Sequence, residues 1–391
     1  MQSPATQWEE TMKTQSLMLT ATSAAAMMLA GASAHAEDYK AVILQSLTGG
    51  AAFIGKNVAD GAVLAAEELN EQGFFGEGNK LVFSVEDDAT DRTQTLSLIT
   101  RLAADPATLM VMGPTSGSVA LAGANVANER EFPVMTTTNS MEVLENGPWS
   151  FIMTQPASIT MPFIADYTAE TLGVETCAVI GVKDNEAYVA LQRMYEDLIT
   201  EAGVEIVSND GVALADSDFS ALATKVASSD QDCVFVGTPA AQGANIILQL
   251  KQAGLDPDTA ILGHNAFASP TFIEKGGAAV EGVYLIGAWV PGGDNEFSSA
   301  FAENFEEKMG FPADEWNAMG YSGMQVVAHA IRDAAEAGNA TREGVRDALG
   351  EQKDVPVVVG THTYTLDEER VPFFGMKVLQ VKDGEFTVAP E

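Results

Sequence analysis

The sequence predicts an α/β protein built from two doubly wound parallel-sheet lobes joined by a three-segment hinge. Short apolar runs alternate with segments in which apolar residues recur at helical spacing, and this alternation occurs in two successive sets. Such alternation indicates parallel sheets with helices on both faces. The chain has 391 residues, 46% of them hydrophobic, so it can fill the cores of two domains.

The first set of elements begins with the apolar run 41–47. The helix that follows is predicted from Val58, Ala62 and Leu69, which recur on one helical face. In chain order, the expected strands are 41–47, 81–85, 109–112 and 133–136, and the expected helices are 58–69, 93–104 and 118–130.

The second set begins after Met153 and has the same alternation. The expected helices are 160–172, 187–202, 219–228 and 242–253, and the expected strands are 177–182, 204–208, 233–236 and 260–263. Residues 296–350 are then helical without intervening strands, and 355–388 contain several short strands. Those helices have no new sheet to cover, so we expect the chain to return to the first lobe. We assign the lobes as follows: 37–155 and 290–360 form lobe 1, and 156–289 and 361–391 form lobe 2.

The first 36 residues have the pattern of a secretory signal peptide. Lys13 supplies the positive charge, a short stretch of apolar and small residues follows, and an Ala-His-Ala motif allows cleavage after Ala36. The stretch is too short, and too rich in Ala, Ser and Thr, to anchor the chain in a bilayer. We therefore expect export to a bacterial periplasm. A conventional signal begins at Met12, which makes 1–11 a candidate over-extended gene start.

The composition restricts the partners and the redox state. The formal net charge of −35 opposes binding to nucleic acid or anionic lipid.

The two cysteines, Cys177 and Cys233, each lie four residues before a glycine that ends an apolar run. If the runs are neighbouring parallel strands, the thiols lie side by side and an exported protein can oxidise them. The alternative is two reduced core cysteines. The histidines show no ligand spacing, so no metal is expected.

The loop after the first strand resembles the beginning of a phosphate loop. Gly50, Gly55 and Lys56 fit that pattern, but Asn57 stands where Ser or Thr would hold the metal of a nucleotide. Nucleotide hydrolysis is therefore not expected. What remains is a glycine-bearing loop at the carboxyl end of a strand.

Two further polar loops follow strands of the first lobe. In 113–118, Ser116, Gly117 and Ser118 offer free backbone amides at a helix start, where a carboxylate is stabilised. The third loop, 136–140, again follows a strand. The alternative is ordinary helix capping without a ligand. Helix capping alone does not require three such loops at the carboxyl ends of the strands of one sheet. Ligands of open α/β sheets bind at that edge of the sheet.

Two loops of the second lobe are expected to face the same cleft. One carries Tyr188, which could also be a core or surface aromatic residue, and the other carries His264 and Asn265. We interpret His264 as a bystander, because no nucleophile is arranged near it. No G-x-S-x-G, H-E-x-x-H or C-x-x-C motif occurs, so neither an enzyme nor a cofactor is expected.

In this order, these motifs resemble the periplasmic leucine/isoleucine/valine-binding proteins. The resemblance rests on 47–55 and 57–70, on the acidic segment 86–91 and on the loop 113–117, and it extends from about Tyr39 to the carboxyl terminus. It implies two lobes that close on a small ligand, with crossings near 154–158, 287–291 and 359–363.

The resemblance also implies roles for site residues. A ligand carboxylate would be held by lobe-1 loops, a tyrosine of lobe 2 would cover it, and the opening loop would border it. The implied ligand-binding residues are Phe53, Ile54, Ser116, Gly117, Ser118, Thr138, Ser140, Tyr188, Asn265 and Tyr321. Two positions depart from the pattern. Asn265 stands where amino-acid binders place an acidic residue against the α-ammonium group, and Ile54 stands where a tyrosine is common.

The function implied by the resemblance is capture of a small carboxylate- or amide-bearing solute for an ABC importer. The membrane permease and the ATPase would be other chains, and the binding protein is expected to be a monomer. A ligand sensor of the same fold is the alternative. An exported enzyme is a more distant one.

Overall fold

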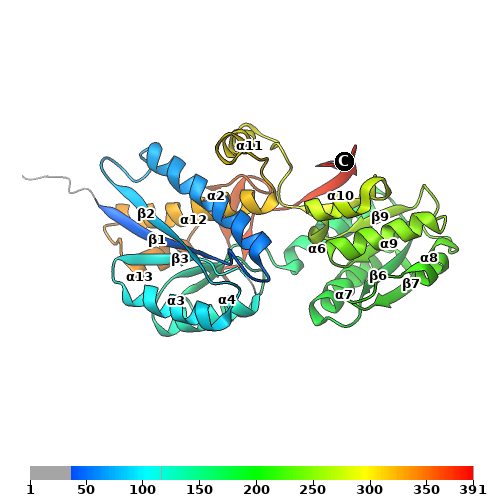
Figure 1. Ribbon diagram of the computed structural model, residues 1–391, viewed down its shortest axis with the longest axis horizontal. Coiled ribbons are helices and arrows are strands. Elements are labelled where there is room, and N and C mark those ends of the chain that lie inside the picture. The colour runs from blue at the N-terminus through cyan, green and yellow to red at the C-terminus, as the bar shows by residue number, and fades with distance from the viewer. Residues whose placement is uncertain (1–36, 116, 391) are drawn as a thin grey trace, which may run out of the picture.

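The computed structural model describes residues 37–115 and 117–390, apart from the side chains of Ser118 and Ala187. It contains two lobes that lie side by side along the long axis (Figure 1). The predicted α/β class with two lobes is confirmed. The predicted signal peptide at 1–36 lies outside the described residues. In the described part of the chain, no helix is both long and apolar enough to cross a membrane.

Lobe 1 is built on a five-stranded parallel sheet. Its strands are β1 (Asp38–Gln45), β2 (Lys80–Asp87), β3 (Thr108–Met112), β4 (Val134–Thr136) and β5 (Ser150–Ile152). Its helices are α2 (Ala52–Glu71), α3 (Arg92–Ala104), α4 (Gly117–Glu129), α5 (Glu142–Glu145), α11 (Glu296–Met309), α12 (Glu315–Glu336) and α13 (Arg342–Gly350). The strand order is β2-β1-β3-β4-β5. The last five residues of β1 are all buried, as expected for a strand that helices cover on both faces.

Lobe 2 repeats this strand order and extends it. Its strands are β6 (Thr176–Val182), β7 (Glu205–Val212), β8 (Cys233–Gly237), β9 (Ala260–Gly263), β10 (Tyr284–Gly287), β14 (Lys377–Lys382) and β15 (Glu385–Val388). Its main helices are α6 (Ala157–Asp166), α7 (Glu186–Glu201), α8 (Ser220–Ala227), α9 (Ala240–Gln252) and α10 (Pro270–Gly276). The parallel strands run β7-β6-β8-β9-β10, and β14 and β15 add antiparallel strands at the β10 edge.

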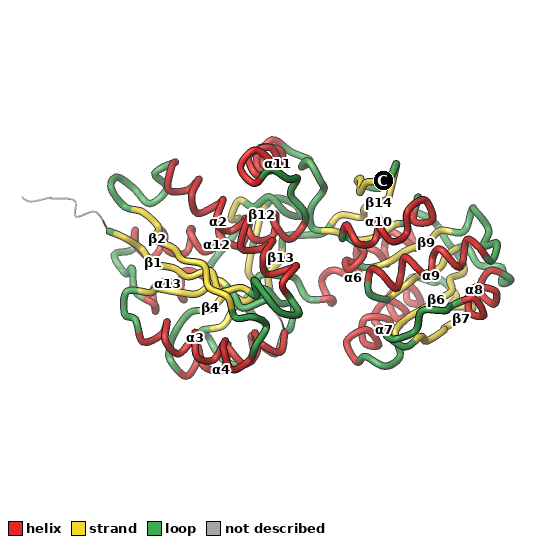
Figure 2. The backbone as a smooth tube through the Cα atoms, in the orientation of Figure 1, coloured by secondary structure: helices red, strands yellow, loops and turns green. Residues whose placement is uncertain are grey.

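The chain passes between the lobes after β5, after β10 and before β14. The small strands β11 (Val355–Pro356), β12 (Thr363–Leu366) and β13 (Pro372–Phe373) lie with lobe 1, and β14 lies with lobe 2 (Figure 2). Between β12 and β13, Arg370 donates hydrogen bonds to three carbonyl oxygens of residues 144–150 in lobe 1. The assignment of 361–391 to lobe 2 is therefore wrong for 361–373, and the third crossing lies after Phe373 rather than near 359–363.

The two longest helices, α2 and α12, pack with their backbones in contact. A Cβ atom on Gly61 would collide with the carbonyl oxygen of Asn317, and one on Gly320 would collide with the α2 backbone. The amino end of α12 is also fixed by hydrogen bonds: Asn57 Nδ2 donates to Asp314 Oδ2 at 2.7 Å, and Asp314 forms a capping box with Asn317. This packing holds the first turn of α12 rigidly at the edge of the β1 sheet.

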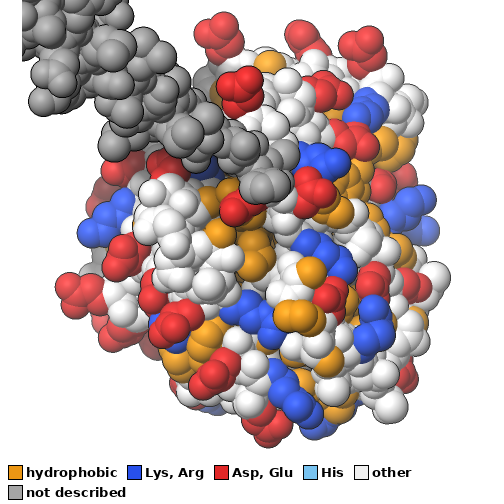
Figure 3. Space-filling model, turned by 90° about the vertical axis from the view of Figure 1, so that its left-hand side faces the viewer, with side chains coloured by type: hydrophobic (Ala, Val, Ile, Leu, Met, Phe, Trp, Pro, Cys, Tyr) orange, Lys and Arg blue, Asp and Glu red, His pale blue; other side chains and the backbone are white. Residues whose placement is uncertain are grey.

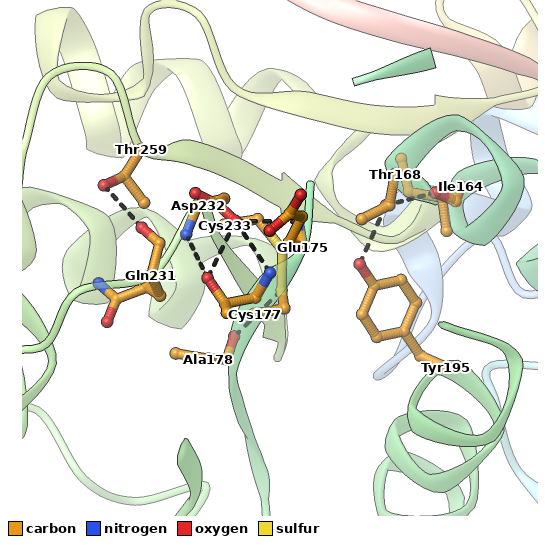
Figure 4. The surroundings of a disulfide bond; sticks show 11 residues. Ile164, Thr168, Glu175, Cys177, Ala178, Tyr195, Gln231, Asp232, Cys233 and Thr259 are labelled. Carbon is orange, nitrogen blue, oxygen red and sulfur yellow. Dashed lines mark hydrogen bonds between the residues drawn. A yellow bond between two sulfur atoms is a disulfide. The ribbon is translucent and has the colours of Figure 1, made fainter. Parts of the chain in front are cut away.

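A disulfide joins β6 to β8. Cys177 and Cys233 are partners in the strand register, and their Cα atoms are 4.6 Å apart (Figure 4). Nearby, the hydroxyl groups of Thr168 and Tyr195 form a buried hydrogen bond of 3.0 Å. Both cysteines lie at the amino ends of their strands. The bond is therefore at the edge of the sheet opposite to the one where ligands of this fold class bind.

The end of lobe 1 that lies away from lobe 2 shows how charged side chains are arranged on one face of the molecule. On the end of lobe 1, Asp and Glu side chains are spread widely and are interspersed with Lys and Arg (Figure 3). Ion pairs of lobe 1 include Arg101 with Glu86 and Lys308 with Glu67. On this face, the basic groups do not merge into one large patch of the kind that binds polyanions.

Candidate functional site: the cleft between the lobes

The carboxyl ends of the strands in both sheets border two adjoining cavities. The larger, of about 750 Å³, is lined by the start of α2 and the 139–141 loop on lobe 1, and by α7 and the loop after β9 on lobe 2. The smaller, of about 300 Å³, lies at the hinge and is lined by Thr115, Gly117, Thr138, Asn265 and Glu315, among others. Residues of both lobes line each cavity, so one ligand there would contact both lobes.

A buried glutamine organises the polar wall of lobe 1. Gln45, at the end of β1, donates to the Met112 carbonyl oxygen at 3.3 Å and to Thr137 Oγ1 at 3.2 Å, and it accepts from Thr115 Oγ1 at 2.5 Å. Gln45, Thr115 and Thr137 are all buried. The loops after β1, β3 and β4 are thereby held to one another, and Gly117 and Thr138 are carried on a fixed frame. Sequence analysis did not identify Gln45.

The acidic segment after β2 supports the opening loop. Asp87 accepts hydrogen bonds from the Leu47 and Thr48 amides and from the Thr48 hydroxyl. Burial acts to raise the pKa of the Asp87 carboxyl, but these bonds together with the Ala89 amide hold it below its usual value. Asp88 accepts from Ser46 Oγ at 2.6 Å. Neither carboxylate lines the two cavities, so this segment shapes the loop and does not contact the cleft.

On lobe 2, a buried histidine positions the residues that face the cleft. His264 is only 3% exposed, and its Nε2 donates to the Thr238 carbonyl oxygen at 3.0 Å. Burial lowers the pKa of His264, so the ring is neutral at pH 7. Tyr188 meets the ring edge-on at 5.8 Å, and burial raises the pKa of Tyr188. His264 Nδ1 accepts a hydrogen bond from the Ala266 amide at 3.4 Å, and Asn265 lines both cavities beside it.

The first turn of α12 brings Glu315 and Trp316 to both cavities. Part of Glu315 faces the cleft, but its Oε2 atom is fully buried and has no hydrogen-bond partner among the described residues. Burial raises the pKa of Glu315 to about 8, although the Ala288 amide donates to the carboxylate, and the negative charge of Asp314 adds to the rise. Sequence analysis missed both residues. The sequence feature that could have identified them is the occurrence of an acidic and an aromatic residue together in the first turn of a helix that belongs to lobe 1.

Six of the ten predicted ligand-binding residues line the cavities: Phe53, Ile54, Gly117, Thr138, Tyr188 and Asn265. Ser116 and the side chain of Ser118 lie outside the described residues. Ser140 adjoins the lining residues Asn139 and Met141 but is not itself a lining residue. Its amide donates to Thr138 Oγ1 at 3.3 Å.

Tyr321 is a correction to the predicted site. Its ring is 3% exposed and packs on Phe297 and Phe301, and its hydroxyl donates to Glu68 Oε2 at 2.6 Å. It lies on the face of α12 that packs against α2 and α11, and it lines neither cavity. Trp316 is the aromatic residue of α12 that does.

The described residues hold no group of three or more His, Cys, Asp or Glu side chains arranged to bind a metal ion. The polar groups of the cleft are hydroxyls, amides and one carboxylate. This set is suited to hydrogen bonding with a small polar molecule.

The sequence model of the family described as periplasmic binding protein matches residues 38–385. The chain is 28% identical over 353 residues to the Leu/Ile/Val-binding protein BraC3 of Rhizobium johnstonii, with 88% of this chain and 92% of the relative covered. It is 27% identical over 360 residues to the Leu/Ile/Val-binding protein homolog 3 of Brucella melitensis, with 89% and 93% covered.

Solved structures give the same picture of the fold. A putative branched-chain amino acid ABC transporter protein from Rhodospirillum rubrum superposes with a TM-score of 0.79 at 23% identity, covering 91% of this chain and all of that one. A Streptococcus pneumoniae branched-chain amino acid binding protein in complex with isoleucine gives 0.75 at 20% identity, covering 90% and 98%. An R. palustris solute-binding protein in complex with benzoate gives 0.70 at 19% identity, covering 90% and 95%.

Proposed function

Because the chain belongs to the periplasmic binding protein family, we propose that it captures a small carboxylate- or amide-bearing solute between its lobes and delivers it to the permease of an ABC importer. It is a substrate-binding protein of the branched-chain amino acid type, like the relatives it matches, and not an enzyme. The class of ligand and the delivery step are what the proposal adds.

The observation that carries the proposal is the pair of cavities lined by both lobes. A ligand that contacts both lobes binds the closed arrangement more tightly than the open one, and so shifts the population toward closure. Closure is the signal by which a permease can distinguish loaded from unloaded protein.

The lobe-1 wall supports a carboxylate or an amide oxygen as the recognised group. Gly117 begins α4, where backbone amides have no partner within the helix, and Thr138 offers a hydroxyl beside it. Two structural neighbours fit this assignment, because isoleucine and benzoate share a carboxylate although only isoleucine carries an amine.

The larger cavity supports an apolar body on the ligand. Phe53, Ile54, Leu191, Met194 and Trp316 line it, and the phenylalanine ring is 52% exposed at the rim. A side chain of the ligand that enters this cavity would cover that apolar surface, and the gain is about 25 cal/mol for each Å² removed from water.

Export and cleavage after Ala36 are part of the same proposal. Expression of the complete gene in a Gram-negative host, followed by mass spectrometry of the periplasmic fraction, tests both. We expect a single species that begins at Glu37. A cytoplasmic product that retains residues 1–36 would contradict the proposed localisation.

A thermal-shift panel on residues 37–391 tests ligand capture. The protein is unfolded and refolded with its disulfide intact to remove bound ligand. It is then mixed with amino acids, amine-free aliphatic and aromatic carboxylates, and amides. A ligand at 100 times its Kd stabilises the fold by about 2.7 kcal/mol, which raises the melting temperature clearly. If no compound of these classes shifts the transition, the proposed ligand class is wrong.

A further inference from the structure

The hinge cavity contains two buried polar atoms that lack partners. Glu315 Oε2 and Thr154 Oγ1 are inaccessible to solvent and make no hydrogen bond with the described residues, and both side chains line the 300 Å³ cavity. They come from different elements, the first turn of α12 and the first crossing between the lobes. Buried polar groups without a partner are rare because leaving them unpaired costs free energy.

Once Glu315 is ionised, both atoms can accept a hydrogen bond from a donor. An ionised carboxylate only accepts hydrogen bonds, and a hydroxyl can accept one as well. The described residues that line the two cavities include no Lys or Arg, so no side chain of the cleft supplies a compensating positive charge. A buried carboxylate without a cation is unstable unless it is protonated or acquires a charged partner.

We propose that Glu315 and Thr154 receive a protonated amine of the ligand on the floor of the hinge cavity. This inference rests on the proposed function, because it assumes that the cleft binds a solute. An ammonium group has three donors, which suit Glu315 Oε2, Thr154 Oγ1 and a third acceptor in the same cavity. Its positive charge replaces the cation that the cleft lacks.

This ammonium site lies on α12, whereas the sequence suggested the loop after β9. The sequence directs attention to Asn265, whose neutral amide cannot balance a buried positive charge. Glu315 lines the same cavity as Asn265, Gly117 and Thr138. A ligand whose carboxylate meets the lobe-1 loops can therefore present a nearby amine to Glu315. Its apolar part then extends into the larger cavity, which Trp316 also lines.

The ionisable groups around Glu315 are few. Asp314 adjoins it, but its carboxylate accepts from Asn57 Nδ2 and the Asn317 amide. The other ionisable side chains that line the cavities are His264, which is buried and neutral, and Tyr188, whose pKa burial raises. Glu315 is therefore the group whose proton is lost when a cation binds, because a nearby positive charge lowers a carboxyl pKa.

Isothermal titration calorimetry with matched ligand pairs tests the inference. L-leucine is compared with 4-methylpentanoate, and L-phenylalanine with 3-phenylpropanoate, so that each pair differs only in the amine. We expect the amine-bearing member of at least one pair to bind at least about 10-fold more tightly, the range that a charge-assisted hydrogen bond gives. Glu315→Gln should remove most of that preference, and Thr154→Val should reduce it to a smaller extent.

Proton exchange provides a second readout that loss of folding cannot mimic. With a pKa of about 8, Glu315 is mostly protonated at pH 7, so binding of a cation should release close to one proton per ligand. The number follows from titrations in two buffers of different ionisation enthalpy. Glu315→Gln should release close to none. Glu296→Gln, the same change in the exposed first turn of α11, should behave as wild type.

Three results would overturn the inference. One is equal affinity for both members of each pair in wild type, the second is an unchanged amine preference in Glu315→Gln, and the third is proton uptake on binding. Proton uptake would mean that Glu315 stays protonated and donates to an acidic ligand. If the amine-free acids bind and the amines do not, the proposed function survives and this inference fails. If neither set binds, and amides do not bind either, both fail.

Discussion

Glu315 makes the ligand-free protein sensitive to alkaline pH. Its folded-state pKa of about 8 lies above the ordinary value of 4.5, so folding favours the protonated carboxyl. The stability that the protonated form contributes is complete below about pH 4.5 and is lost as the pH rises toward 8, by at most about 1.4 kcal/mol per pH unit. Thermal unfolding of Glu315→Gln without ligand should show a higher melting temperature than wild type at pH 8, and nearly the same one at pH 4.5. A difference that does not vary with pH would contradict the raised pKa.

Tyr321 should stabilise lobe 1 without affecting affinity. Its hydroxyl donates to Glu68 Oε2 from a buried position, so Tyr321→Phe removes one charge-assisted hydrogen bond. We expect a loss of about 1–2 kcal/mol in the free energy of unfolding, measured by denaturant titration. Calorimetry of the same variant should give an unchanged Kd for whichever probe binds wild type. A loss of affinity without a loss of stability would mean that Tyr321 belongs to the ligand-binding site.

The two aromatic residues of α12 illustrate what the sequence could and could not predict at this scale. The resemblance alone placed an aromatic residue of this segment, Tyr321, near the ligand, whereas Trp316 is the one that lies beside the cavities. Trp316 and Tyr321 are five residues apart, which rotates them by roughly 140° around the helix axis. The contact with α2 decides which one faces the cleft. That contact depends on the close approach at Gly61 and Gly320, which a single sequence does not reveal.

At the scale of elements, the disulfide should stabilise lobe 2 selectively. Cys177 and Cys233 are 56 residues apart, and the enclosed segment lies in lobe 2. Closing a loop of that size restricts the unfolded chain by about 2–4 kcal/mol. Scanning calorimetry of the Cys177→Ala, Cys233→Ala double variant should show a lower transition for lobe 2, while the transition of lobe 1 stays in place. Affinity should change little, because the cysteines lie at the amino ends of their strands. A shift confined to lobe 1 would contradict this account.

The parallel strands were the most predictable elements, and the short antiparallel strands were the least. Runs such as 177–182 and 233–236 are apolar throughout because helices cover both faces of the sheet, and this pattern is visible in one sequence. The residues 361–373 carry no comparable signal. They belong to lobe 1 because Arg370 bonds to carbonyl oxygens there and the Tyr364 hydroxyl donates to the Ile152 carbonyl oxygen of β5, contacts that depend on the folded arrangement. The third crossing was therefore misplaced.

At the scale of the whole molecule, ligand binding should close the lobes, and one tryptophan should report it. Residues 37–391 contain Trp149, Trp289 and Trp316. The first two are at most 9% exposed, whereas Trp316 lines both cavities. Binding of a probe identified by the thermal-shift panel should therefore change the tryptophan fluorescence mainly through Trp316. Over the same concentration range, small-angle X-ray scattering should give a smaller radius of gyration, because a ligand held by both lobes favours the closed population.

Trp316→Phe separates the optical signal from the motion. It keeps an aromatic surface in the cleft but removes the fluorophore, so most of the fluorescence change should disappear while the scattering change persists at higher probe concentration. Trp149→Phe, a matched substitution in a buried position away from the cavities, should leave both signals intact. If wild type binds the probe with no change in the radius of gyration, the two lobes do not close on it. Recognition by a permease would then have to depend on something other than lobe closure.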